Sequence, residues 1–386
     1  MIFAFLISLV ALGLFALILN LNVPGTWKFG LAVLEMYLVS KVFSKKYNFQ
    51  TEMGMILLRS KKGLEIIDKI AQKGESIFNF FADTGGSIGY GLLSLVFFKK
   101  TTNWKTLIVG IAVLAVLVLF IAPNALYFLV NVVKVQTMDK TSNIGANTDG
   151  SLSLFGILSM AALVIGGLFL FIVISMLYYS FIVFNAIYST VAHGTNAIAT
   201  TAPGGSFLLP GVNLPFVEGI LALAIVLIVH EGAHAVLARI GKIPVLSSGL
   251  VLFGVLPVGA FVEPDEAELN KSDDVKQTRV LIAGSTSNLY TSLIFFLLFI
   301  GFVYFLNSVN VIGTIFQAPA KFIYILLGLT FSLNFIVGTV NLLPVPLFDG
   351  HRILDVNLKN KLIVKILSYA TLAAFIANFL PWLFKP

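Results

Sequence analysis

Apolar stretches about as long as a membrane-spanning helix, which needs roughly 20 residues, recur along the whole chain. The stretches that we predict to span a membrane are 2–20, 27–43, 106–131, 152–184, 217–240, 277–306, 321–345 and 361–384. Charged residues make up 11% of the sequence, far below the roughly 25% that is usual in soluble proteins. The sequence therefore predicts an all-α polytopic protein whose helices cross the lipid bilayer of the cell membrane several times.

The net charge of +7 fits such a protein, because Lys and Arg collect in loops on the cytosolic side of a membrane. Basic residues cluster in or beside 241–276 and 350–360, whereas the loops 185–216 and 307–320 contain none. We expect the two basic segments to face the cytosol, so the span 217–240 runs inward. The positive charge is thus no indication that the protein binds nucleic acid.

The segment 44–84 is the only extended polar region. It mixes charged and apolar residues at helical spacing, which predicts a surface or interfacial helix on the cytosolic side. The following stretch, 85–99, is too short for a confident span. The number of crossings in the N-terminal half therefore stays open.

Three polar side chains interrupt the apolar run "LIVHEGAHAVLA" within the span 217–240. On a helix, His230 and His234 are four residues apart and share one face, so both imidazoles can bind one metal ion. Glu231 beside them can act as a general base on a metal-bound water. Polar residues are costly inside a membrane, which favours a functional site over a chance arrangement. The chain contains no cysteine, which excludes thiolate ligands and nucleophiles.

A catalytic zinc usually has three protein ligands, so a third must come from another segment. Asp349 in "NLLPVPLFDGHR" is the acidic residue at the end of another span, and it is our preferred ligand. His193, in a glycine-rich outer loop, and His351, two residues after Asp349, are the alternatives.

These motifs resemble those of the site-2 proteases, which are intramembrane zinc metalloproteases. The family combines HExxH on one span with an Asn-x-x-Pro…Leu-Asp-Gly motif on a later one, here 230–234 and 341–350. Supporting matches of archaeal type are "PGVNLP", "GAFVEPDE" and "AGSTSN". Phe348 departs from the usual leucine, "AGSTSN" lacks a proline after Gly284, and Gly232 replaces a bulkier residue. We expect Gly232 to allow close helix packing or to leave room for substrate.

The resemblance implies a three-helix catalytic core with a membrane-dipping β-hairpin at 247–263, preceded by additional N-terminal transmembrane helices. It implies hydrolysis of peptide bonds in transmembrane segments, with Zn²⁺ as cofactor and a single-span membrane protein as substrate partner. His230, His234 and Asp349 would bind zinc near the cytosolic side of the bilayer, and Glu231 would be the catalytic base.

The same resemblance suggests two further residues and a division of the chain. Asn288 and Asn341 would hold the substrate backbone. An N-terminal membrane domain would occupy 1–200 and the metalloprotease domain 201–386, and the link 307–320 is too short to hold a PDZ domain.

Two other classes of protein remain as alternatives. A transporter or ion-binding protein would use the His/Asp cluster to translocate a metal ion, and it would carry broken helices in two matching halves. A prenyl-protein-type protease would take a glutamate as its third ligand from a later helix.

Overall fold

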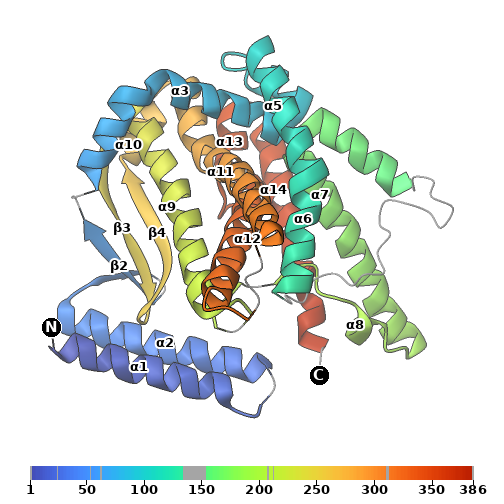
Figure 1. The fold of residues 1–386 in the computed structure, drawn as a ribbon. Coiled ribbons are helices and arrows are strands. Elements are labelled where there is room, and N and C mark those ends of the chain that lie inside the picture. Colours follow the sequence, from blue (N-terminus) through green and yellow to red (C-terminus); the bar gives the residue numbers. More distant parts are fainter. Residues whose placement is uncertain are drawn as a thin grey trace.

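The computed structural model describes residues 2–23, 25–52, 54–60, 63–133, 154–206, 208–211, 213–309 and 313–384. Within them the protein is mostly helical and carries one small antiparallel sheet (Figure 1). Seven helical stretches in this part of the chain are long and apolar enough to cross a membrane: Leu64–Phe97, Trp104–Val132, Leu154–His193, Phe216–Ile240, Asp274–Ser308, Gln317–Val340 and Lys361–Phe384. Their number and composition support the predicted multi-pass membrane protein.

Three helices, α9 (Phe216–Ile240), α11 (Asp274–Ser308) and α12 (Gln317–Val340), pack against one another at the centre of the molecule. They correspond to three of the predicted spans. The Ser292 hydroxyl of α11 donates a hydrogen bond of 2.7 Å to the Phe331 carbonyl of α12, and the Phe331 ring packs edge-to-face with Phe296, with ring centroids 5.2 Å apart.

The other helices surround this centre (Figure 1). They are α1 (Ile2–Asn20), α2 (Gly25–Tyr47), α3 (Leu64–Tyr90), α4 (Ser94–Phe97), α5 (Trp104–Val116), α6 (Ala122–Tyr127), α7 (Leu154–His193), α8 (Ala197–Thr200), α10 (Glu266–Lys271), α13 (Asp349–Asn357) and α14 (Lys361–Ala377), with the shorter turns η1 (Gly91–Leu93), η2 (Leu117–Ile121), η3 (Phe128–Val132) and η4 (Leu380–Phe384).

The sheet consists of β1 (Gln50–Glu52), β2 (Met55–Ser60), β3 (Val245–Phe253) and β4 (Leu256–Pro264), in that order and antiparallel throughout. The expected hairpin is therefore present as β3 and β4. The all-α prediction is wrong in one respect, since part of the segment 44–84 forms strands and not helix. Its residues Met55–Ser60 alternate less clearly than a typical surface strand, but they gain a ladder of backbone hydrogen bonds by pairing with β3.

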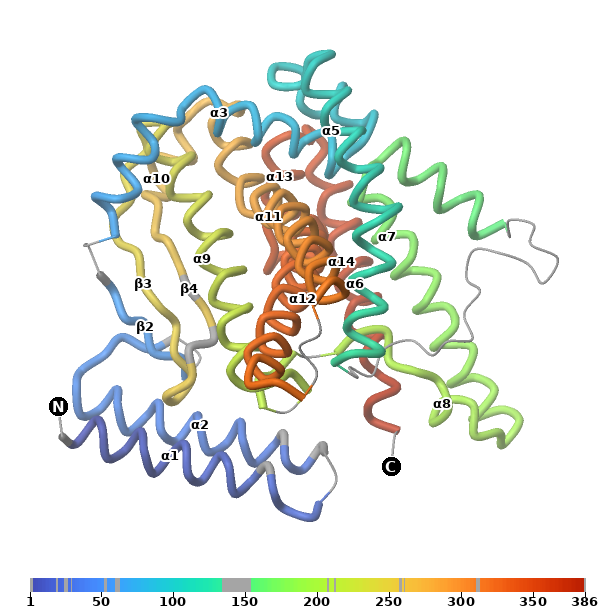
Figure 2. The backbone as a smooth tube through the Cα atoms, viewed as in Figure 1, coloured from blue at the N-terminus to red at the C-terminus, as the bar shows by residue number. Residues whose placement is uncertain are grey.

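Helix α3 lies across the ends of α9 and α11 (Figure 2). Asp68 of α3 pairs with Arg239 in the last turn of α9 at 2.9 Å. Fifteen residues later, Asp83 accepts two hydrogen bonds of 2.7 Å from Arg279, near the start of α11. Because α9 and α11 are antiparallel neighbours, Arg239 and Arg279 lie at the same end of the bundle. A helix tied to both over about 22 Å of its length must run across that end.

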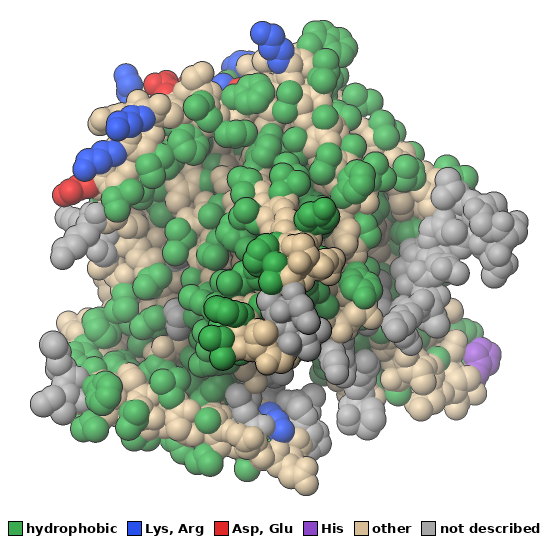
Figure 3. Space-filling model, viewed as in Figure 1, with side chains coloured by type: hydrophobic (Ala, Val, Ile, Leu, Met, Phe, Trp, Pro, Cys, Tyr) green, Lys and Arg blue, Asp and Glu red, His purple; other side chains and the backbone are tan. Residues whose placement is uncertain are grey.

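The interfacial helix expected in 44–84 stays a prediction, because the length and composition of 64–97 also permit a span. Most of the charged side chains visible in Figure 3 lie at the end of the molecule where α3 runs.

The N-terminal hairpin of α1 and α2 lies crosswise to α9 at the opposite end of the bundle (Figure 1). Met36 of α2 is buried against Phe253 and Leu256 at the turn between β3 and β4. The Ser40 hydroxyl accepts a hydrogen bond of 2.7 Å from the Gly254 N–H in the same turn. The predicted spans 2–20 and 27–43 form helices, but neither is among the seven candidate spans of the described residues.

Helix α7 bends sharply at Gly167, which has φ 58° and ψ −154°. The bend lets its backbone pass directly against that of η1, where a side chain on Gly91 would lie 2.6 Å from the Val164 carbonyl oxygen. The predicted span 152–184 thus consists of two helical segments that meet at Gly167. Its first two residues lie outside the described residues.

We predict that Asp83→Ala destabilises the protein by about 3 kcal/mol, because it leaves Arg279 partly buried without its bidentate partner. Unfolding in detergent would measure the loss. The control is Lys276→Ala, which removes an exposed ion pair with a separation of 3.7 Å and should change stability far less. Equal effects of the two substitutions would contradict the anchoring role of Asp83.

Candidate metal centre and cleft

Two histidines of α9 and the first residue of α13 meet inside the molecule. The Nε2 atoms of His230 and His234 are 3.2 Å apart, since the two rings lie one turn apart on the same face of α9. The Oδ2 atom of Asp349 lies 3.3 Å from each Nε2 atom. The three residues that the sequence suggested as ligands therefore form one cluster that is able to hold a metal ion.

Asp349 reaches the histidines because the chain leaves helical geometry before it. Helix α12 ends at Val340, and the following segment contains Pro344 and Pro346, which disfavour helix. The segment then folds back, and the Gly350 N–H donates a hydrogen bond of 2.8 Å to the Asn341 carbonyl. A side chain on Gly350 would collide with the Leu342 carbonyl oxygen, so only glycine fits directly after Asp349.

One stripe of α11 faces the two histidines with residues four apart: Val280, Gly284 and Asn288. The Val280 carbonyl accepts a hydrogen bond of 2.7 Å from Nδ1–H of His234, an arrangement that leaves the lone pair of Nε2 free. The buried Asn288 amide lies 3.1 Å from Nδ1 of His230. A Cβ on Gly284 would lie 2.5 and 2.6 Å from the two Nε2 atoms, so glycine keeps this space open.

The cluster fits a tetrahedral zinc ion by its chemistry and spacing. In such a site, with zinc–ligand distances of about 2.0–2.1 Å, neighbouring ligand atoms lie roughly 3.3 Å apart. The three separations here are 3.2, 3.3 and 3.3 Å. The Oδ2 atom of Asp349 is buried and has no hydrogen-bond partner, and a cation would compensate its charge.

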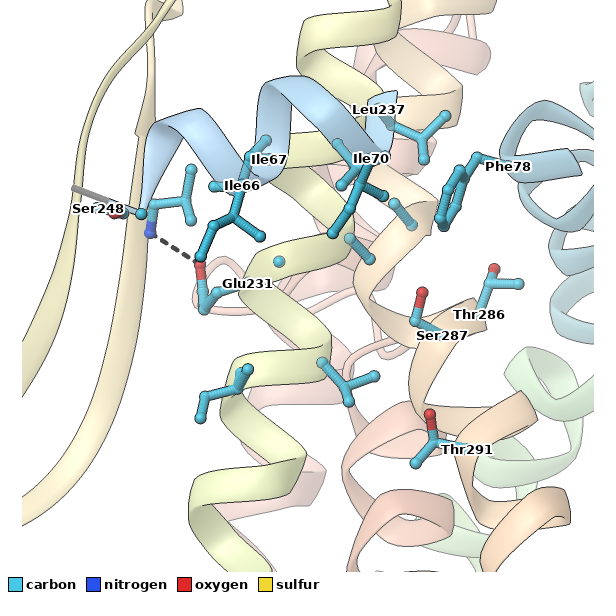
Figure 4. A pocket seen from close by; sticks show the side chains of 18 of the residues that line it. Ile66, Ile67, Ile70, Phe78, Glu231, Leu237, Ser248, Thr286, Ser287 and Thr291 are labelled. Atoms are coloured by element: carbon cyan, nitrogen blue, oxygen red, sulfur yellow. Dashed lines mark hydrogen bonds between the residues drawn. The ribbon is translucent and has the colours of Figure 1, made fainter. Parts of the chain in front are cut away.

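Glu231, next to His230 on α9, lines a cleft of about 750 Å³ (Figure 4). Its Oε2 atom accepts a hydrogen bond of 3.1 Å from the Val262 N–H of β4. The cleft is largely apolar and is formed by segments from both halves of the chain. Its walls are residues of α3 (Ile66, Ile67, Ile70, Phe78), α9 (Val229, Gly232, Val236), β3 and β4 (Leu250, Phe261) and α11 (Thr286, Ser287, Tyr290).

The space beside Gly232 is open, because a Cβ there would meet nothing within 4 Å. Gly232 lines the cleft. Of the two expectations for this residue, close helix packing or room for substrate, its open surroundings fit the second.

The other residues singled out in the sequence lie elsewhere. Asn341 is not among the cleft-lining residues, and its amide donates a hydrogen bond of 3.1 Å to the Val337 carbonyl within its own helix end. His193 is exposed at the end of α7 and packs against Tyr188. His351 makes a hydrogen bond of 2.8 Å with Ser368 of α14. In the described residues, neither histidine joins the metal-ligating cluster.

Two contributions to the site had no usable signal in the sequence. The Val262 N–H acts through the backbone, which leaves no trace in residue type. The α3 wall comes from a segment about 160 residues before Glu231, whose mixture of charges and isoleucines indicated only an interfacial helix.

Several helices that could span a membrane, and a His/His/Asp cluster beside a glutamate, are features that suit a membrane metalloprotease. Residues 218–378 match the family model of Peptidase family M50, the site-2 protease family. The match covers α9, the β-hairpin, α11, α12 and α13, which hold the cluster and Glu231.

A relative from Methanocaldococcus jannaschii, described as an uncharacterized protein, is 40% identical over 79 residues. The aligned part is 20% of this chain and 21% of the relative. The comparison with solved structures found no match.

We predict that Gly284→Ala lowers zinc affinity at least about tenfold, because the added methyl group lies against both Nε2 atoms. Competition with a chromogenic chelator would measure it. The matched control is Gly301→Ala in the same helix, where a Cβ meets nothing within 4 Å. Unchanged zinc affinity in Gly284→Ala would show that the metal does not bind between these nitrogens.

Proposed function

We propose that the protein is a zinc-dependent intramembrane endopeptidase that hydrolyses peptide bonds in transmembrane segments of membrane-anchored proteins. The observation that carries this proposal is the placement of Glu231. Its carboxylate lies in an apolar cleft, whereas the adjacent His230, together with His234 and Asp349, forms the metal cluster behind it. One turn of α9 thus joins a metal site to a substrate-sized cavity.

His230, His234 and Asp349 would hold the zinc ion. Zinc would supply a water of lowered pKa and polarise the scissile carbonyl. Glu231 would accept a proton from the water and pass it to the leaving amine, as a general base and then a general acid. The apolar walls of the cleft, including Ile67, Val236 and Phe261, exclude bulk water around the reacting groups.

The sheet supports the substrate class. A helical segment hides its peptide carbonyls in its own hydrogen bonds, so it must unwind before it can be cut. Strand β4 is the outer strand next to the cleft, since the order is β1-β2-β3-β4 and β2 covers the other edge of β3. An unwound substrate can add to β4 as a further strand, with main-chain hydrogen bonds that do not depend on its side chains.

We predict that Glu231→Gln keeps zinc affinity but lowers the cleavage rate about 10²–10⁴-fold, because the amide cannot accept the proton. Asp349→Ala should instead lose most of the zinc affinity together with cleavage. Model transmembrane peptides and metal analysis of the purified protein would measure both quantities. The control is His351→Ala, which removes a contact with α14 and should retain zinc.

Two experimental outcomes would contradict the proposal. Loss of zinc from folded Glu231→Gln would make Glu231 a ligand, and wild-type cleavage by Asp349→Ala would exclude Asp349 as one.

We further propose that the active site lies toward the cytosolic side of the membrane. The native chain lacks cysteine, so single cysteines give an unambiguous readout. Lys271→Cys, at the exposed end of α10, should react with a membrane-impermeant thiol reagent from the cytosolic side only. Thr195→Cys, in the exposed loop before α8, should react from the opposite side. The reverse pattern would invert the orientation.

A further inference from the structure

Asn288 is buried completely, although it carries four hydrogen-bonding positions. Its Nδ2 atom lies 3.1 Å from Nδ1 of His230. Its Oδ1 atom is buried and has no hydrogen-bond partner in the described residues. It is not among the residues that line the cleft, so its surroundings point to the imidazole and not to a bound peptide.

The direction of this hydrogen bond determines which nitrogen of His230 carries the proton. With Nδ2–H facing Nδ1, the imidazole accepts a hydrogen bond from the amide at Nδ1 and carries its own proton on Nε2. That Nε2–H is directed at Nε2 of His234, 3.2 Å away, whose Nδ1–H in turn donates to the Val280 carbonyl. In this arrangement Nε2 of His230 has no lone pair for a metal ion.

A half-turn of the amide reverses the arrangement. Oδ1 then takes the place of Nδ2, accepts the proton of Nδ1–H, and leaves the Nε2 lone pair free. Among the described residues, Asn288 is the side chain that contacts Nδ1 of His230, so it provides the acceptor there. His234 already has a fixed acceptor in the Val280 carbonyl. The two histidines therefore differ, since only His230 depends on a side chain for its tautomer.

We propose that Asn288 is a positioning residue that sets the tautomer of His230, with Oδ1 accepting the Nδ1–H proton when Nε2 of His230 binds the metal. This inference rests on the proposed metal site. It replaces the substrate-binding role that the resemblance suggested for Asn288. Groups that orient a metal-binding histidine in this way typically change metal affinity by about 10–100-fold.

The test compares Asn288→Asp with Asn288→Leu. Aspartate keeps an acceptor beside Nδ1–H and loses the amide N–H, whereas leucine keeps the approximate size and loses both. Asn288→Asp should bind zinc at least as tightly as the wild type, and Asn288→Leu about 10–100-fold more weakly. With cobalt as the probe metal, the visible absorption bands should match the wild type in Asn288→Asp and change in Asn288→Leu.

The matched control is Asn334→Leu. Asn334 of α12 is equally buried, has an unpartnered Oδ1 atom, and donates from Nδ2 to the Thr330 carbonyl of its own helix. Its replacement removes a buried amide of the same kind without touching His230, so zinc affinity and the cobalt spectrum should stay unchanged.

The outcomes separate this inference from the proposed function. Wild-type zinc affinity in Asn288→Leu overturns the inference. A tenfold loss of zinc affinity in Asn288→Asp overturns it as well. If Asn288→Leu fails to fold, the measurement on Asn288→Asp alone decides between the outcomes. Weakened peptide binding with unchanged zinc affinity in Asn288→Leu would overturn the inference and support a role of Asn288 in substrate binding. Failure of the wild-type protein to bind zinc would instead overturn the proposed function.

Discussion

The register between α9 and α11 is the constraint on which the site depends. The two helices are antiparallel, and each presents residues four apart to the other: His230 and His234 on α9, and Val280, Gly284 and Asn288 on α11. A shift of either helix by one residue would remove the hydrogen bonds of both imidazoles at once. The absence of a side chain at position 284 allows this close approach, which explains how a membrane-embedded pair of helices can hold polar groups without leaving them all unsatisfied.

The N-terminal half of the chain supplies part of the sheet and of the cleft wall around the region that matches the M50 family model. Strand β2 covers one edge of β3, the guanidinium of Arg59 pairs with Glu263 at 3.3 Å, and α3 forms one wall of the cleft. The proposed boundary near residue 200 therefore does not separate two independent surfaces. Segments on both sides of it enclose the same cavity, and the two ion pairs of α3 hold that wall at the ends of the helices that carry the site.

The sequence was informative where a single segment decides the structure. Runs of apolar residues located the central helices, and the spacing of His230 and His234 required a shared helix face. Pro344 and Pro346 just before Asp349 are visible in the sequence and disfavour helix there. Pairing of β2 with β3 was not predictable, because the partners are about 190 residues apart and Met55–Ser60 has no strong alternation. The surroundings of Asn288 were also out of reach, since an asparagine in a span equally suits helix association or ligand binding.

In the proposed reaction, the hydrogen bond between Glu231 and the Val262 N–H would link peptide binding to proton transfer. An extended substrate that pairs with β4 needs the same N–H, so its carbonyl oxygen competes with the carboxylate of Glu231 for one donor. A segment that remains helical has no carbonyl to offer and leaves this bond intact. Selectivity on this view would follow from the local helix propensity of the substrate more than from its side chains, and a single proline or glycine near the scissile bond would distinguish a good substrate from a resistant one.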